Sequence, residues 1–196
     1  LSAELVQDEF AHWDNIDVHY RGQVVTSGGH GFCGLGRQRL LNILQNRAAE
    51  LGVRMQFEHE VTKPEEYADT DLVVACDGIN SSIRKRYAKQ FQPDIDVRAN
   101  KFVWLGTYKV FEAFTFIFEE TEHGWIWAHA YRFNRDTSTF IVECTEQTWQ
   151  NIGFSSMSQE ESITTCEMLF ARYLDGNKLL SNAEHLYSSA MWINFR

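Results

Sequence analysis

Four short runs of aromatic and β-branched residues in the second half of the chain constrain its fold more than any other sequence feature. The runs are residues 101–107, 115–120, 125–133 and 139–145, with turn residues between them. Strands joined by short turns are typical of an antiparallel sheet. A capping box from Ser158 to Glu161 then predicts the start of a helix. We therefore expect an antiparallel sheet with one helix in this half.

The first half of the chain shows a mixed pattern of strands and helix. Residues 37–51 carry apolar residues at helical spacing, which predicts a helix that ends before Gly52. Residues 16–26 predict a β-hairpin. Alternation over 53–57 and an apolar run over 71–76 predict two more strands, the second of the kind that a parallel sheet buries on both faces. The predicted fold class is therefore α/β.

The change of pattern near Pro93 is the one candidate domain boundary, because the sequence contains no internal repeat and no low-complexity linker. The chain has 196 residues, of which 44% are hydrophobic, so it can fill one sizeable core, or one domain and part of another. We expect residues 1–93 and 94–196 to belong to different domains.

Composition excludes several classes of function. The chain has 18 Lys and Arg against 27 Asp and Glu, and its net charge of −9 disfavours binding to nucleic acid. No apolar run reaches the roughly 18 residues that a membrane span needs. The first residues also lack the apolar core of a secretory signal. We expect a cytoplasmic protein that binds neither nucleic acid nor membranes.

The cysteine spacing indicates neither zinc nor a disulfide framework. Cys33, Cys76, Cys144 and Cys166 form no C-x-x-C pair and lie among apolar or small residues, so we expect reduced, buried thiols. A group of acidic residues with His123, between residues 119 and 123, lies on a predicted hairpin tip and lacks a second histidine at ligand spacing. No metal site is expected.

A glycine-rich segment precedes the predicted helix. Gly29, Gly31 and Gly34 fit the G-x-G-x-x-G fingerprint with which dinucleotides bind at a helix N-terminus. The preceding strand ends in polar residues and belongs to a predicted hairpin, which argues against that interpretation. An NAD(P)-binding oxidoreductase that uses this loop is the first alternative function. Arg37, in the first turn of the helix, fits an anion-binding residue and an exposed side chain equally well.

The turn after the apolar run 71–76 is a second candidate site. Asp77 and Gly78 follow the run directly, and Ser81 and Arg84 come next. In open α/β sheets ligands bind at the carboxyl ends of strands, which is where this turn is expected. From the residues alone, an ordinary turn with Asp77 bonded to the backbone and Ser81 capping a helix explains the pattern as well.

The string D-G-x-x-S-x-x-R from Asp77 to Arg84 resembles the DG motif of the class A FAD-dependent aromatic-ring monooxygenases, the hydroxybenzoate-hydroxylase group. Arg37, Leu40 and Leu44 resemble the helix of that family whose arginine reaches the flavin. Residues 29–34, 102–107, 116–125 and 129–132 are similar to the branch of the family that acts on aryl-CoA thioesters. The resemblance covers essentially the whole chain.

The resemblance implies a partial Rossmann-like FAD domain over 1–93, followed by an antiparallel-sheet substrate domain over 94–196. The family's first strand with its own G-x-G-x-x-G, and its later Gly-Asp motif, have no counterpart here, so the chain resembles the central part of such an enzyme. The implied reaction hydroxylates an aromatic substrate: NAD(P)H reduces FAD, and O₂ adds to form a flavin C4a-hydroperoxide. The activity of such a piece by itself, its exact substrate and a homodimeric state stay open.

For the site, the resemblance implies that the cofactor is bound by Arg37, Asp77, Gly78, Ser81 and Arg84. The residues that match the family's substrate-holding positions are Phe118, His129 and Tyr131. The spacing of two places His129 and Tyr131 on one face of a strand. The cofactor carries the chemistry, so no catalytic side chain is expected. The alternative for Phe118 is core packing, and the alternative for His129 is a hydrogen-bonded histidine of the core. A non-catalytic binding protein derived from an oxygenase is the second alternative function.

Overall fold

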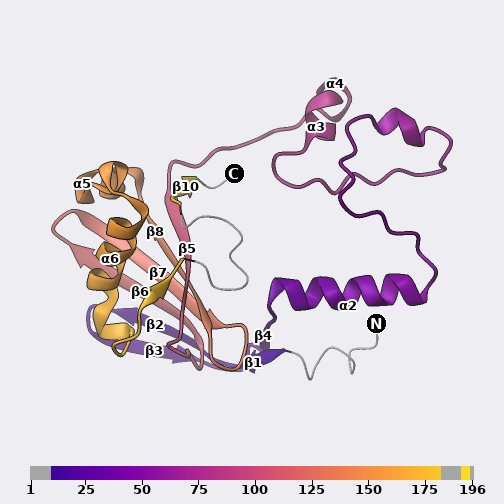
Figure 1. Ribbon diagram of the computed structural model, residues 1–196. Helices are drawn as coiled ribbons and strands as arrows, with labels where there is room; N and C mark the ends of the chain where they lie inside the picture. The colour runs from indigo at the N-terminus through magenta and orange to yellow at the C-terminus, as the bar shows by residue number, and fades with distance from the viewer. Residues whose placement is uncertain (1–9, 182–190, 195–196) are drawn as a thin grey trace.

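The computed structural model describes residues 10–181 and 191–194, and its main feature is a large, mostly antiparallel sheet (Figure 1). The central strands are β5 (Lys101–Thr107), β8 (Ser138–Cys144), β7 (Gly124–Arg132) and β6 (Phe114–Thr121), in this spatial order. Each is antiparallel to its neighbour, which confirms the sheet predicted from the four runs. The α/β class is confirmed as well.

Strands from near both ends of the chain also pair with this sheet. The predicted hairpin is confirmed as β2 (Ile16–Tyr20) and β3 (Gln23–Ser27), and β2 pairs parallel with β6. On the other side, β10 (Ile193–Asn194) and β9 (Leu179–Leu180) pair with β5. The hairpin from the first half of the sequence thus lies in the same sheet as the second half, while the domain division near residue 93 stays a prediction.

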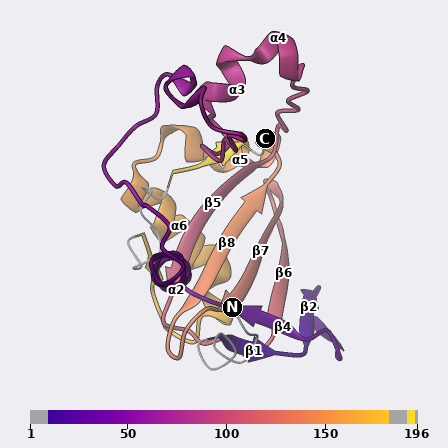
Figure 2. The same ribbon diagram turned by 90° about the vertical axis from the view of Figure 1, so that its right-hand side faces the viewer.

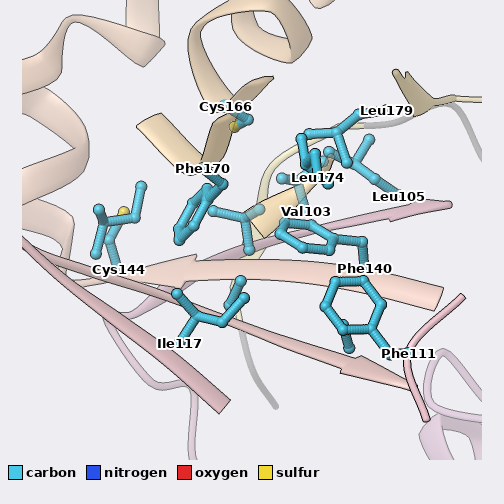
Figure 3. Close-up of a cluster of buried hydrophobic side chains, with 14 of the residues drawn as sticks. Val103, Leu105, Phe111, Ile117, Phe140, Cys144, Cys166, Phe170, Leu174 and Leu179 are labelled. Carbon is cyan, nitrogen blue, oxygen red and sulfur yellow. The ribbon is translucent and has the colours of Figure 1, made fainter. Parts of the chain in front are cut away.

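Two helices, α5 (Glu146–Ile152) and α6 (Gln159–Phe170), lie on one side of the sheet (Figures 1 and 2). The predicted capping box starts α6: Glu161 N donates to Ser158 Oγ and Ser158 N donates to a Glu161 carboxylate oxygen. The core forms between these helices and the sheet (Figure 3), and its largest fully buried side chains include Leu105, Ile117, Phe140 and Phe170. Full burial of one such side chain stabilises the fold by about 1.5–3 kcal/mol.

The glycine-rich segment leads into a strand rather than directly into a helix. A two-stranded ribbon forms from β1 (Ala11–Trp13) and β4 (Phe32–Gly34), and the predicted helix follows as α2 (Arg37–Glu50). Since β3 before the glycines belongs to an antiparallel hairpin, the segment lacks the parallel strand-to-helix geometry of a dinucleotide site. The nicotinamide-binding interpretation of these glycines therefore has no support in the fold.

The predicted strands over 53–57 and 71–76 are wrong. Both segments are irregular, and Leu72, Val73 and Val74 are 77%, 51% and 70% exposed. A strand exists only where its backbone pairs with a neighbour, and no other described residue pairs with either segment. The helical pieces nearby are short: η1 (Pro64–Tyr67), α3 (Ser82–Arg86) and α4 (Ala88–Phe91).

The cysteines divide into two classes. Cys144 and Cys166 are buried as predicted, whereas Cys33 and Cys76 are exposed, so burial was wrongly predicted for these two. Cys33 lies on the short ribbon and Cys76 in the irregular segment, where little protein covers either. Within the described ranges, no group of three or more His, Cys, Asp and Glu side chains is arranged to hold a metal ion. No helix in the part of the chain that the structure describes has the length and apolar character to cross a membrane.

Candidate functional site

The turn after residue 76 holds one candidate site, and Asp77 organises it. Asp77 Oδ1 accepts a hydrogen bond from Ser81 Oγ at 2.5 Å. Its Oδ2 accepts from Ser82 Oγ at 3.3 Å and from the Ile83 amide at 3.2 Å. The bond from the Ser81 side chain first, and then bonds from backbone amides such as that of Ile83, lower the pKa of the Asp77 carboxyl to about 2, against an opposing effect of desolvation. The side chain is therefore a carboxylate at every physiological pH.

The remaining residues of the turn hold its backbone. Gly78 has φ +79°, a conformation that favours glycine. Ser81 caps α3, since its Oγ accepts from the Arg84 amide at 2.9 Å. The Arg84 guanidinium donates to the carbonyl oxygens of Gly78 and Ile79. The structure thus brings together four of the five predicted cofactor residues, and it shows Arg84 clamping the turn.

Open space surrounds this turn. A depression of about 730 Å³ is lined by Val73, Cys76, Asp77 and Ser82, among others. A second, of about 1020 Å³, has Gly78, Ser81 and Arg84 in its lining. The fifth predicted cofactor residue, Arg37, begins α2 next to β4, away from α3 (Figure 1). The structure therefore does not bring Arg37 to the turn.

The sheet face opposite α5 and α6 is a second candidate site. We call it the aromatic face, defined by Phe114, Phe116, Phe118, Trp127, His129 and Tyr131, and α2 lies on its side of the sheet (Figure 2). Alternate residues of β7, Ile126, Ala128 and Ala130, are fully buried against the core. Because side chains alternate along a strand, the prediction that His129 and Tyr131 share a face is confirmed.

Aromatic contacts order this face. The His129 ring stacks on Phe116 with centroids 5.8 Å apart and an interplanar angle of 23°. Tyr131 lies 5.3 Å from Phe114 and 5.9 Å from Trp13, centroid to centroid. Burial raises the pKa of Tyr131, so its hydroxyl stays protonated. Phe118 lies opposite Trp127 in the register of β6 and β7, so the three predicted substrate residues share one face.

Glu143 belongs to this face, and the sequence reasoning missed it. It lies on β8 opposite Trp127, and its Oε2 is 3.8 Å from His129 Nε2. Burial lowers the pKa of His129, and the nearby Glu143 charge opposes that shift. The signal was present in the strand pattern: a lone carboxylate interrupts an aromatic and β-branched run at an alternating position.

Comparison with known proteins shows which proteins the chain is similar to. No family model matches the chain. Salicyloyl-CoA 5-hydroxylase from a Streptomyces species is 37% identical over 201 residues, covering 98% of this chain and 38% of that protein. Protodeoxyviolaceinate monooxygenase from Chromobacterium violaceum is 31% identical over 166 residues, covering 84% of this chain and 44% of that protein. The chain is homologous to aromatic monooxygenases.

Solved structures of flavin-dependent enzymes share the fold of this chain. PqsL from Pseudomonas aeruginosa, described as a probable FAD-dependent monooxygenase, matches with a TM-score of 0.60 at 16% identity, covering 99% of this chain and 58% of that chain. A mutant of the flavin-dependent brominase Bmp2 matches with a TM-score of 0.56 at 10% identity, covering 98% of this chain and 54% of that chain. The chain spans about two fifths of the length of the curated relatives it matches.

Proposed function

We propose that this chain supplies the substrate face and part of the flavin site of an FAD-dependent monooxygenase that hydroxylates an aromatic ring with NAD(P)H and O₂. The observation that carries the proposal is the aromatic face with His129 and Tyr131 at its centre, in a chain homologous to aromatic monooxygenases. An apolar wall with few polar groups orients a ring and excludes water from the reaction.

FAD, when bound, supplies the redox chemistry, and the residues of the Asp77 turn fit a role in holding it. The turn places a fixed carboxylate and a glycine with positive φ beside open space, and backbone can approach a ligand closely at such a glycine. We assign Asp77, Gly78 and Ser81 to the cofactor, and Arg84 to the shape of the turn. Arg37 stays a proposed cofactor residue at the start of α2.

The substrate we propose is an aromatic ring linked as a thioester. One relative is named for a CoA thioester and another, 3-hydroxy-4-methyl-anthranilyl-[aryl-carrier protein] 5-monooxygenase from Streptosporangium sibiricum, for a ring carried on a protein. On the aromatic face, His129 and Tyr131 provide the polar atoms that would orient the ring, and Phe118 would border it. We further propose the division into a flavin part up to residue 93 and a substrate part after it, with the hairpin 16–27 joined to the substrate sheet.

The test is expression of the protein from its complete coding sequence. We expect it to purify with flavin absorbance and to oxidise NADPH or NADH faster when an aryl-CoA thioester is present. Asp77→Ala should lower flavin retention, whereas Glu66→Ala, on the exposed η1 helix, should not. Nicotinamide-dependent activity without flavin would favour the first alternative function. A folded protein that retains no flavin would favour the non-catalytic alternative.

A further inference from the structure

The pair His129 and Glu143 is the polar centre of the aromatic face, and its geometry is unusual. His129 Nε2 is shielded from solvent and has no hydrogen-bond partner, although Glu143 Oε2 lies 3.8 Å away. The two side chains are 24% and 14% exposed. Since Nε2 is buried, the exposed part of His129 consists of its other atoms. A carboxylate and an imidazole edge therefore reach the surface together.

A depression opens at this pair. It measures about 560 Å³ and is lined by Arg98, Ala99, Asn100, His129 and Glu143. The charged groups in its lining are Arg98 and Glu143. The Arg98 guanidinium pairs with Asp96 at 2.8 Å, with both side chains largely exposed, so solvent and Asp96 compensate its charge. The half-buried charge that a ligand meets here is the carboxylate of Glu143.

We propose that Glu143 is a specificity-determining residue: beside the His129 ring, its carboxylate accepts a hydrogen bond from an O–H or N–H group on a neutral aromatic ring, and it disfavours rings that carry a carboxylate. This inference rests on the proposed function, since it names the substrate class of the same face. It involves no covalent step. The donor keeps its proton.

The physical reason is the low polarity around the pair. Phe116 stacks on His129, and Trp127 lies beside Glu143 in the sheet register, so water screens charges on this face poorly. A second carboxylate near Glu143 would be repelled, and both would lose hydration. An amide or thioester in place of the carboxylate removes that repulsion and keeps the ring. The ring's hydroxyl or amino group then donates to the exposed part of the Glu143 carboxylate, beside the His129 ring.

The experiment compares three probes that share a ring: 3-hydroxybenzamide, 3-hydroxybenzoate and 3-methoxybenzamide. The first probe is neutral and has a phenolic O–H donor, the second is anionic and has the same donor, and the third is neutral with that donor capped by a methyl group. Binding to the complete flavin-loaded protein is measured by calorimetry. Chemical shifts of ¹⁵N-labelled histidine report on His129, assigned by the loss of its signal in His129→Gln. The variants are Glu143→Gln and the control Glu160→Gln, which removes the same charge from an exposed position on α6, behind the sheet.

We expect 3-hydroxybenzamide to bind at least about tenfold more tightly than either other probe and to shift the His129 signals. Glu143→Gln should reduce the preference over 3-hydroxybenzoate severalfold, and Glu160→Gln should leave it unchanged. The inference is overturned if 3-hydroxybenzoate binds as tightly as 3-hydroxybenzamide to the natural protein, if Glu143→Gln leaves the ratio unchanged, or if no probe shifts His129. Flavin absorbance and NAD(P)H oxidation are read separately on the same preparation, so failure of the proposed function is distinguishable from failure of this inference.

Discussion

Replacing Gly34 by alanine tests whether the third glycine of the glycine-rich segment serves packing or nucleotide binding. A Cβ atom at this position would lie 2.8 Å from the carbonyl oxygen of Arg132 and 3.0 Å from the Trp13 ring. The Arg132 backbone lies at the end of β7, opposite Ser138 of β8 in the sheet, so it cannot retreat easily. The ribbon strand β4 must therefore shift away from the aromatic face, and Trp13 with it.

The size of the effect follows from two opposing contributions. Overpacking by one methyl group costs about 1–3 kcal/mol. The substitution also removes chain entropy from the unfolded state, which returns about 0.4–1 kcal/mol. We expect a net loss of about 1–2 kcal/mol, which for a chain of this size lowers the Tm by about 2–8 °C.

The assay is thermal unfolding followed by circular dichroism, with Gly36→Ala as the matched control. Gly36 has φ −59°, and a Cβ there would meet only Phe133 at 3.8 Å, an ordinary contact. Its Tm should stay close to that of the natural chain. The packing argument is refuted if Gly34→Ala is as stable as Gly36→Ala. A dinucleotide fingerprint tolerates alanine at its third glycine, so a nucleotide-binding loop would show that very result.

Three further predictions follow from local interactions. Ser158→Ala removes the capping box of α6 and should cost about 1 kcal/mol in urea unfolding, while Ser155→Ala, at an exposed position, should cost little. Ellman's reagent should label Cys33 and Cys76 in the folded protein and all four thiols after denaturation. The reason is that burial raises the pKa of Cys144 to about 12 and shields Cys166 as well. Labelling of more than two thiols in the folded chain would contradict this prediction. Burial holds the pKa of His129 below its usual value of 6.5, so the imidazole binds a proton more readily in the unfolded chain than in the folded one. The contribution of His129 to stability should therefore decrease as the pH falls below about 6.5. His129→Gln should remove that part of the pH dependence, measured as urea midpoints, and an unchanged profile would contradict the assignment.

The elements predicted correctly are those whose signals are local. Each of these signals lies within a few neighbouring residues. They predicted the four strands of the second half, the hairpin after residue 16, the helix that begins at Arg37 and the cap at Ser158. Alternation along β7 was enough to place His129 and Tyr131 on one face. The turn at Asp77 was also predictable, because a strong capping pattern surrounds it.

Other features depend on partners that local sequence does not reveal. An apolar run such as 71–76 becomes a strand only when neighbouring strands take up its backbone hydrogen bonds, and none of the described residues does so. For the same reason Cys76 is exposed despite its apolar neighbours. Glu143 lies near His129 because of the register between β8 and β7, which the sheet as a whole sets.

By itself, the sequence determined the aromatic antiparallel strands, the alternation that divides each strand between two faces, and the acidic composition that disfavours nucleic acid. These depend on side-chain type and spacing alone. The tertiary structure decided which face the helices α5 and α6 cover, and so which aromatic residues line the open face. It also decided that the hairpin joins that sheet and that a carboxylate lies beside the histidine. Such pairings arise from contacts between segments distant in sequence, which no short pattern encodes.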